Sequence, residues 1–172
     1  ILFKRLGAYD EHERLKNMYK ANMFKRGYSE WTHNACTALK ERGLDENTYH
    51  DIVNSRKFSK GAREFFAALK TSDITVGLIS GSFYELAERA RKELGIDEAQ
   101  IAAHCKLVFD ANGKLDYWKI DITDYDDKAD VVRIFCENKG IPLDRVAYIG
   151  DDVNDIETFK IVGLPIAFNS VK

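Results

Sequence analysis

The chain has 172 residues and a formal net charge of −2. This length fits one domain, or one domain with a small insert, and it allows a core that needs no disulfide or metal support. The nearly balanced charge excludes a general attraction to nucleic acid or anionic membranes, and no apolar run approaches the roughly 18 residues of a membrane span.

The first third of the chain has the spacing of amphipathic helices. Three helices are predicted, over residues 11–27, 29–43 and 45–55. Ser29 is a candidate N-cap of the second helix and Gly43 its stop, and Asp45 is a candidate N-cap of the third. Residues 1–57 contain no proline and no strand pattern. This segment is therefore expected to form a small helical bundle.

The pattern after Phe58 alternates between helices and strands. Helices are predicted at 60–70, 83–95, 128–140 and 155–163, and strands at 74–80, 145–151 and 164–168, with a hairpin over 103–122 that turns at Asn112-Gly113. The apolar runs 74–80 and 145–151 fit strands that are buried on both faces. We therefore expect an α/β fold, a Rossmann-like parallel sheet with helices on both faces.

Cysteines and histidines are scattered along the sequence. The three cysteines show no CxxC spacing, which is typical of reduced, buried thiols in a cytoplasmic protein. The four histidines show no metal-ligand spacing, so none is expected to bind zinc.

Polar residues follow the first predicted strand where it ends. Ser80 and Gly81 offer a hydroxyl and backbone N–H donors close to a helix start, which is a way to bind an anion. A serine N-cap beside a flexible glycine explains the same residues. Ligands of parallel α/β sheets sit beyond the carboxyl ends of the strands, which is where Ser80 lies. Both an anion site and an N-cap stay open at this point.

A cluster of carboxylates follows the strand at 145–151. Asp151 ends the strand and Asp155 begins the next helix, a spacing that suits a Mg²⁺ ligand and a second carboxylate that holds a bound water. Acidic residues also favour helix N-termini, so an acidic cap is the alternative. Lys128 stands at a predicted helix start, where the helix dipole disfavours a cation. A lysine aimed into a phosphate and carboxylate cluster would explain its position, whereas a solvated surface lysine is the simpler alternative.

Together these pieces resemble the haloacid dehalogenase (HAD) superfamily of phosphohydrolases, and more closely its phosphoserine-phosphatase-like branch. In that family a strand ending in Ser or Thr carries the second motif, matched here by Ser80 in LISGSF. Lys128 matches the lysine of the third motif, and GDDVND at residues 150–155 matches the GDxxND of the fourth. The resemblance covers essentially the whole chain. It implies a helical cap over residues 1–57 and an α/β core over residues 58–172, incomplete at both ends.

The resemblance implies a phosphomonoester hydrolase that acts on a small phosphorylated metabolite. Family enzymes use an aspartate nucleophile, which forms an aspartyl-phosphate that water then hydrolyses, and a second aspartate as general acid and base. By resemblance, Ser80 and the N–H of Gly81 would bind the phosphate, and Lys128 would pair with the nucleophile and the phosphate. Asn154 would help to orient the loop and the phosphate.

The same resemblance implies a Mg²⁺ cofactor, which neutralises charge on the phosphate and orients it. Asp151 would ligate the metal, and Asp155 would hold a metal-bound water or the lysine. Asp152 has no role beyond a negative charge near a helix start. The bulk composition predicts no nucleic-acid or membrane partner, and a homodimer is left open.

The nucleophile motif DxDx[TV] is missing from this sequence. Asp124 and Asp126 have its spacing, but they follow the second motif and lack the apolar strand. The simplest expectation is that about 15 to 25 residues precede Ile1 in the whole protein, as the absence of an initial methionine also suggests. The missing strand would be central in the sheet, so its loss would expose apolar edges. We therefore expect residues 1–172 alone to have no phosphatase activity.

The substrate is a separate question. Phosphoserine-specific relatives place an arginine on the cap, but none occurs in YSEWTHNACTALK at residues 28–40, and Arg26 precedes the aromatic residue. Tyr28, Trp31 and His33 offer aromatic and polar surface instead, although Trp31 suits the core of the cap better. Phosphoserine is one candidate among several.

Three other functions fit parts of the pattern. The first is a catalytically inactive relative that binds a phosphorylated ligand, which the missing motif favours and the retained Ser80, Lys128, Asp151 and Asp155 disfavour. The second is a response-regulator-like receiver, which neither the helical segment before the sheet nor the late GDxxND loop fits. The third is a phosphotransferase of the β-phosphoglucomutase type, which the same chemistry permits.

Overall fold

The computed structural model describes residues 1–25, 27–97, 101–121 and 128–169. Contacts within the chain divide it into two compact units, Ile1–Thr123 and Asp124–Lys172. The predicted boundary between residues 57 and 58 falls inside the first unit, so the division into cap and core stays a prediction. No helix in the described ranges is both long and apolar enough to cross a membrane.

The first unit begins with four helices: α1 (Leu2–Arg5), α2 (Tyr9–Lys20), α3 (Gly27–Glu41) and α4 (Glu46–Ser55). Helix α4 is capped as predicted, because the Asp45 side chain accepts a hydrogen bond from the Thr48 N–H at 2.9 Å. The predicted N-cap at Ser29 is wrong, since α3 already starts at Gly27. The first predicted helix is too long, because Asn22 adopts a left-handed φ of 52° and α2 ends at Lys20.

The rest of the first unit is a mixed three-stranded sheet with two more helices. Its elements are α5 (Ala62–Thr71), β1 (Leu78–Phe83), α6 (Tyr84–Leu94), β2 (Ile101–Phe109) and β3 (Leu115–Ile120). The strand order is β1-β2-β3, with β1 and β2 parallel and β3 antiparallel to β2. The predicted hairpin turn is confirmed, because the Asp110 carboxylate accepts N–H bonds from Asn112 and Lys114 and Gly113 takes a φ of 69°.

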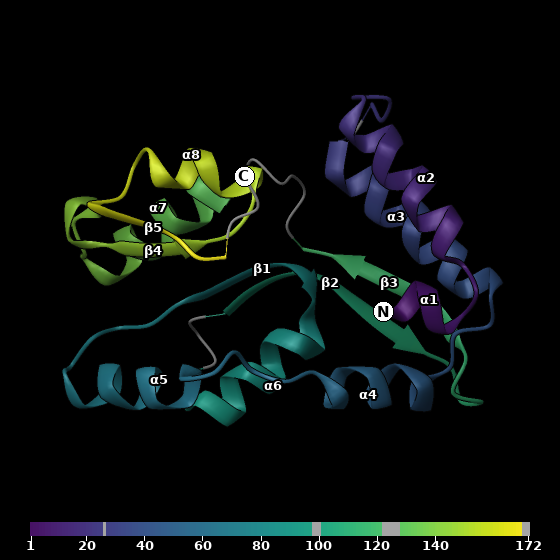
Figure 1. Ribbon diagram of the computed structural model, residues 1–172, viewed down its shortest axis with the longest axis horizontal. Helices are drawn as coiled ribbons and strands as arrows, with labels where there is room; N and C mark the ends of the chain where they lie inside the picture. Colours follow the sequence, from purple (N-terminus) through teal and green to yellow (C-terminus); the bar gives the residue numbers. More distant parts are fainter. Residues whose placement is uncertain (26, 98–100, 122–127, 170–172) are drawn as a thin grey trace. The chain divides into compact units, whose positions relative to one another are not determined.

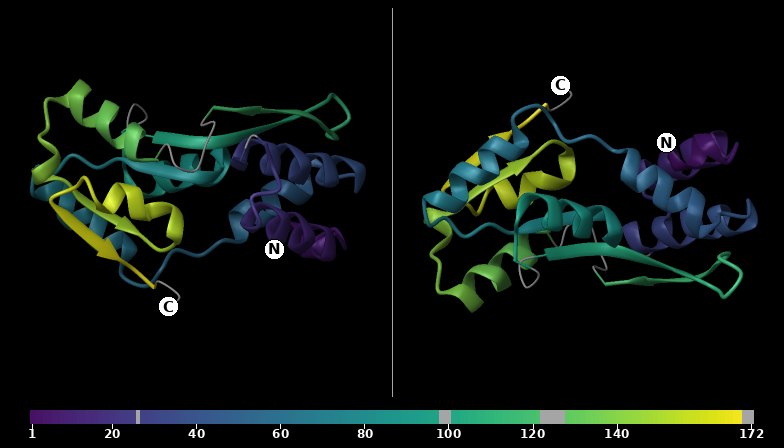
Figure 2. Two further views of the ribbon diagram at one scale, coloured as in Figure 1. Left: turned by 90° about the horizontal axis from the view of Figure 1, so that it is seen from above. Right: turned by 90° about the horizontal axis from the view of Figure 1, so that it is seen from below.

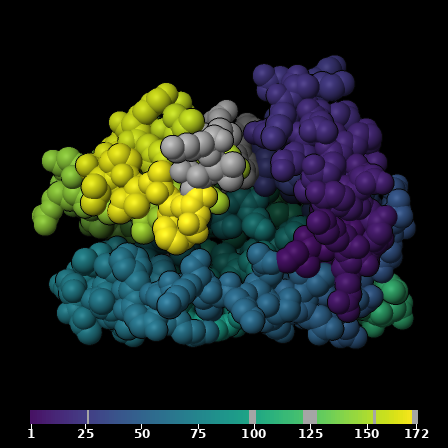
Figure 3. Space-filling model, in the orientation of Figure 1, coloured from purple at the N-terminus to yellow at the C-terminus, as the bar shows by residue number. Residues whose placement is uncertain are grey.

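The core of the first unit joins the helical segment to the sheet. Helices α2 and α3 lie side by side, and α3 lies against the hairpin of β2 and β3 (Figures 1 and 2). Buried residues of this core come from α1 to α4, from the segments that join these helices and from the two hairpin strands; they include Phe3, Leu39, Leu44, Tyr49, Leu107 and Leu115. Figure 3 shows α4 and α5 in succession along one side of this unit. The helical bundle is thus built onto strands that come much later in the sequence.

The second unit is a small parallel βαβ arrangement. It contains α7 (Lys128–Lys139), a 3-10 turn at Leu143–Arg145, β4 (Ala147–Gly150), a 3-10 turn at Val153–Asp155, α8 (Ile156–Phe159) and β5 (Leu164–Ala167). Strands β4 and β5 pair in parallel, with Ala147 opposite Leu164 and Gly150 opposite Ala167. The predicted α/β class with parallel strands and helices is confirmed. The helix predicted over 155–163 shrinks to one turn.

The two predicted strands at 74–80 and 145–151 differ from expectation. The first begins only at Leu78, and neither strand is buried on both faces: Ile74 before β1 is 51% exposed and Ile149 in β4 is 48% exposed. The physical reason is pairing. Within the described residues, β1 pairs only with β2 and β4 pairs only with β5, so both are edge strands, which are less covered than the inner strands of a parallel sheet.

Candidate active site

Ser80 and Gly81 lie in a bulge of β1. Ser80 is opposite Ala103 and Phe83 is opposite Cys105, so three steps along β1 match two along β2. Gly81 and Ser82 therefore share the place opposite His104, which is the geometry of a β-bulge. The N–H of Ser82 donates to the Ser80 Oγ at 3.2 Å. Ser80 is not an N-cap, because α6 starts at Tyr84 and its N-cap is Phe83, so that alternative is wrong.

The bulge is held from outside by a helix. The Tyr28 hydroxyl, on α3, donates to the Gly81 carbonyl at 2.7 Å. Tyr28 is only 9% exposed, and its ring lies 4.9 Å from the Trp31 ring and 4.6 Å from that of His104 between centroids. Of the three aromatic residues that could contact a substrate, Tyr28 thus reaches the bulge. Trp31 packs against the core, as predicted, and His33 lies 5.1 Å from the Trp118 ring.

The second unit brings Lys128 and Asp155 together. Lys128 at the start of α7 donates from Nζ to Asp155 Oδ1 at 2.8 Å, and the Tyr148 hydroxyl donates to the same oxygen at 2.8 Å. Asp155 Oδ2 accepts the backbone N–H groups of Asp151 at 2.9 Å and Asp152 at 3.2 Å. The alternative of a solvated surface lysine is therefore wrong: the Lys128 side chain is 13% exposed and that of Asp155 only 2%.

These four donors set the charge state of Asp155. Burial alone would raise the pKa of this carboxyl, but the hydrogen bonds from Lys128, Tyr148 and the Asp152 N–H outweigh burial and hold the pKa below its usual value. Burial and the bond to Asp155 together raise the pKa of Tyr148. Asp155 is thus an ionised carboxylate that is paired with the Lys128 ammonium group and accepts a hydrogen bond from the neutral hydroxyl of Tyr148.

Gly150 has a steric role that its place in the motif did not reveal. A Cβ at this position would lie 2.5 Å from Asp155 Cγ, closer than any real contact, so the Asp155 carboxyl fills the space beside the glycine. Tyr148 was also missed. The available signal was a hydroxyl inside the apolar strand run VAYIG, because a buried tyrosine hydroxyl usually finds a partner.

Asp151 and Asn154 differ from Asp155 in their surroundings. Asp151 is exposed, and its carboxylate accepts no hydrogen bond from the described residues. Asn154 is half-buried, and its Oδ1 is buried with no hydrogen-bond partner in the described part of the chain. The Asp151 carboxylate is therefore open to a further ligand, whereas the Asn154 Oδ1 is unpartnered but buried. By contrast, each Asp155 oxygen already accepts two hydrogen bonds, which fills its lone pairs.

The predicted site residues fall in separate units, Ser80 and Gly81 in the first and Lys128, Asp151, Asn154 and Asp155 in the second. Within the described ranges no group of three or more His, Cys, Asp or Glu side chains could hold a metal. The alternative nucleophile pair, Asp124 and Asp126, and the arginine at position 26 lie outside the described residues. Their roles stay predictions.

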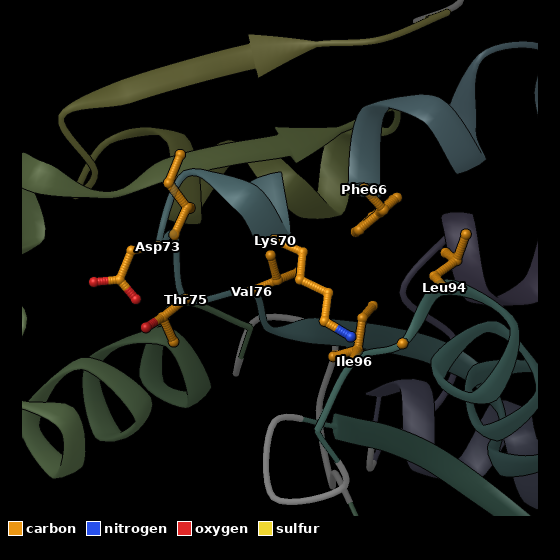
Figure 4. Close-up of a pocket in the computed structure, with 9 residues that line it drawn as sticks. Phe66, Lys70, Asp73, Thr75, Val76, Leu94 and Ile96 are labelled. Carbon is orange, nitrogen blue, oxygen red and sulfur yellow. The ribbon is translucent and has the colours of Figure 1, made fainter. Parts of the chain in front are cut away.

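A separate hollow of about 230 Å³ lies at the other end of β1 (Figure 4). Its lining includes Phe66, Lys70, Ile74, Val76, Leu94 and Ile96. Residues 74–76 precede the first residue of β1, so the hollow is at the amino end of the strand. Ligands of parallel sheets bind at the carboxyl ends, so this hollow is not the expected site.

Comparison with known proteins places these motifs in a family. A family model described as haloacid dehalogenase-like hydrolase matches residues 4–163. The chain belongs to the haloacid dehalogenase-like hydrolases. Within this HAD family it is similar to phosphoserine phosphatases, which confirms the branch predicted from the motifs.

Two curated relatives and one solved structure illustrate the similarity. The phosphoserine phosphatase of Streptococcus thermophilus is 32% identical over 137 residues, which cover 76% of this chain and 62% of the relative. That of Archaeoglobus fulgidus is 31% identical over 170 residues, covering 98% and 47%. The chain thus spans less than two thirds of either relative. A structure of a phospho-aspartyl intermediate analogue of phosphoserine phosphatase matches with a TM-score of 0.81 over 98% of this chain and 78% of that one, at 22% identity, a likeness of fold.

Proposed function

We propose that the whole protein is a Mg²⁺-dependent phosphomonoester hydrolase that acts on a small phosphorylated metabolite through an aspartyl-phosphate intermediate. The carrying observation is the buried ion pair of Lys128 and Asp155 at 2.8 Å, beside the exposed carboxylate of Asp151. Asp155 already accepts hydrogen bonds from Tyr148 and two backbone N–H groups. Burying Lys128 beside it adds a desolvation cost, and a loop with a purely structural role would not need this lysine. The names of the relatives support a phosphatase, and phosphoserine is the first substrate to test.

The residues divide the work by the donors and acceptors that they carry. Lys128 donates to Asp155, and its positive charge beside a phosphate and a nucleophile would reduce the repulsion between these two anions. Ser80 Oγ uses a lone pair to accept from Ser82, which leaves its O–H to donate to a phosphate oxygen. The nucleophile motif DxDx[TV] does not occur in residues 1–172, and the proposal assigns the nucleophile to a part of the protein outside this sequence.

The open oxygens fit a hard cation in part. Asp151 offers an exposed carboxylate, and Mg²⁺ favours such a ligand together with several waters; the Asn154 Oδ1 is unpartnered but buried, so it fits an orienting role better than direct ligation. Asp155 fits less well as a direct ligand, because its oxygens are taken, and it serves to hold Lys128 and the loop. When bound, Mg²⁺ would neutralise negative charge on the phosphate. A cytoplasmic location is part of the proposal, supported by three free, buried cysteines.

The test is phosphate release by the intact gene product, with and without Mg²⁺ and with EDTA. Phosphoserine and several other phosphomonoesters are compared, and product analysis separates transfer to water from transfer to a sugar. The Lys128→Gln variant should lose at least about 100-fold in kcat, by analogy with loss of an electrostatic stabiliser. Lys160→Gln, which breaks an exposed ion pair with Glu157, is the matched control.

Three results would count against the proposal. A folded intact protein that binds inorganic phosphate but hydrolyses nothing would favour the inactive phosphate-binding relative. Phosphate transfer to a sugar would favour the phosphotransferase. Mg²⁺-dependent turnover by purified residues 1–172 alone would contradict the assignment of the nucleophile to another part of the protein.

A further inference from the structure

We propose that Tyr28 is a positioning residue for phosphate binding: it fixes the Gly81–Ser82 peptide unit and thereby aims the Ser80 hydroxyl. This inference rests on the proposed function. It concerns residues of the first unit only, and Tyr28 and Gly81 are separated by 53 positions in the sequence and brought together by the fold. The peptide unit, the helix and the bulge each support it.

Both ends of one peptide unit are tied. Its carbonyl oxygen, that of Gly81, accepts the Tyr28 hydroxyl at 2.7 Å, and its N–H, that of Ser82, donates to the Ser80 Oγ at 3.2 Å. A peptide unit is planar, so fixing both ends fixes its rotation. If the carbonyl were released, the unit could rotate and the Ser82 N–H would leave Ser80. The Ser80 hydroxyl would then lose the contact that orients its remaining donor.

The helix that carries Tyr28 is itself fastened to the sheet by contacts one and two turns further on. Thr32 Oγ1 and His104 Nε2 lie 2.9 Å apart, and the Cys36 and Cys105 sulfurs lie 3.8 Å apart. All four side chains are buried. Residues 28, 32 and 36 share one face of a helix, so this face of α3 contacts the sheet at Gly81, His104 and Cys105. Tyr28 therefore acts from a rigid base.

The bulge explains why such a fastening is needed. Gly81 and Ser82 together face His104, so they are outside the regular ladder. A bulge can re-aim a side chain, but it lacks the ladder bonds that would hold its own peptide groups. Helix α3 contacts both sides of it, Gly81 on β1 through Tyr28 and His104 on β2 through Thr32. Tyr28 thus adds a contact to the peptide unit in the irregular part of the ladder, at the place where phosphate is expected.

The experiment compares Tyr28→Phe with wild type in the intact gene product. The variant keeps the ring and removes only the hydroxyl. Because the loss of one hydrogen bond corresponds to a few-fold to about tenfold change in an equilibrium, we expect the inhibition constant of inorganic phosphate to rise roughly 3- to 10-fold. The value of kcat/KM should fall by the same factor for phosphoserine and for p-nitrophenyl phosphate, since the phosphate is common to both. Tyr117→Phe, on an exposed tyrosine of β3, is the matched control.

Different results point to different conclusions. An unchanged phosphate inhibition constant overturns the proposal. A loss for one substrate only also overturns it, because Tyr28 would then contact the organic part of that substrate. If the wild type hydrolyses neither compound, the proposed function fails, but hydrogen exchange at the Ser82 amide still tests the positioning. That amide should exchange at least about threefold faster in Tyr28→Phe than in Tyr117→Phe, and equal rates overturn the proposal.

A second variant covers the case in which Tyr28→Phe does not fold. Thr32→Val removes the contact to His104 while it keeps the volume of the side chain. It should weaken phosphate inhibition about twofold through a looser α3, again equally for both substrates. No change in phosphate inhibition with Thr32→Val would contradict the proposed rigid base.

Discussion

Two segments are predicted to bind phosphate: the bulge at residues 80–82, here the Ser80 loop, and residues 150–155, here the Asp155 loop. The first is stabilised by a distant residue and the second mainly by its own carboxylate. The Ser80 loop is a bulge, held by a tyrosine 53 residues away. The Asp155 loop is held by its own carboxylate, which collects two backbone N–H groups within four residues and one hydroxyl from the preceding strand. The difference teaches that the residues around Asp155 are organised by one buried carboxylate and its ion pair with Lys128 on α7, whereas the bulge depends on a single hydroxyl from the helix packed over it.

The largest expected effect is on the Asp155 loop. Asp155→Ala would leave Lys128 buried without its carboxylate and two N–H groups without an acceptor. We expect the free energy of unfolding of the second unit to fall by about 3–5 kcal/mol, the usual cost of breaking a buried pair. Thermal unfolding of the intact protein measures this loss. Glu157→Ala, at an exposed pair, should change stability by less than about 0.5 kcal/mol, and equal losses would show that the loop is not centred on Asp155.

A smaller effect is expected from the glycine beside this carboxylate. Gly150→Ala places a Cβ 2.5 Å from Asp155 Cγ, so the side chain must shift away from its donors. The expected cost is about 1–3 kcal/mol, as for other overpacked sites. A double variant with Asp155→Ala gives the decisive comparison by denaturant unfolding. If the clash is with Asp155, the two costs are less than additive, and simple additivity would place the clash elsewhere.

The smallest effect is a dependence on pH. The pKa of Asp155 lies below its usual value of 3.8 in the folded protein, so the folded state favours the ionised form. This contribution to stability is complete above the unfolded pKa and is lost as the pH falls below about 3.8 through the folded pKa. Asp155→Asn should therefore flatten the acid side of the stability curve of the second unit. If the free energy of unfolding of Asp155→Asn falls with decreasing pH as steeply as that of the wild type, other carboxyl groups are responsible for the loss.

Local signals in the sequence predicted local structure well. Asp45 caps α4, Gly95 ends α6 with a φ of 70°, and the turn at Gly113 forms the hairpin, since each depends on a few neighbouring residues. Lys128 and Asp155 could also be predicted, because they belong to short motifs that occur in a fixed order along the chain. The family and the α/β class followed from the joint pattern of these motifs.

Contacts between distant residues could not be read from the sequence. The hydroxyl of Tyr28 meets Gly81, and nothing in either segment encodes that pairing. The start of β1 at Leu78 and the exposure of Ile149 depend on which edges find a partner strand, which an apolar run does not specify. Ser29 suited an N-cap by type, but it lies inside a helix that begins at Gly27.

The hairpin tip has a consequence for how the molecule folds. The Leu115 N–H donates to the Leu44 carbonyl, and the Glu46 N–H donates to the Gly113 carbonyl. The start of α4 is therefore hydrogen-bonded to a turn nearly seventy positions later in the sequence. The early helices therefore cannot complete their core until the hairpin has left the ribosome. High contact order of this kind slows folding and keeps apolar surface open in the meantime. The second unit, built from near neighbours, is expected to fold faster.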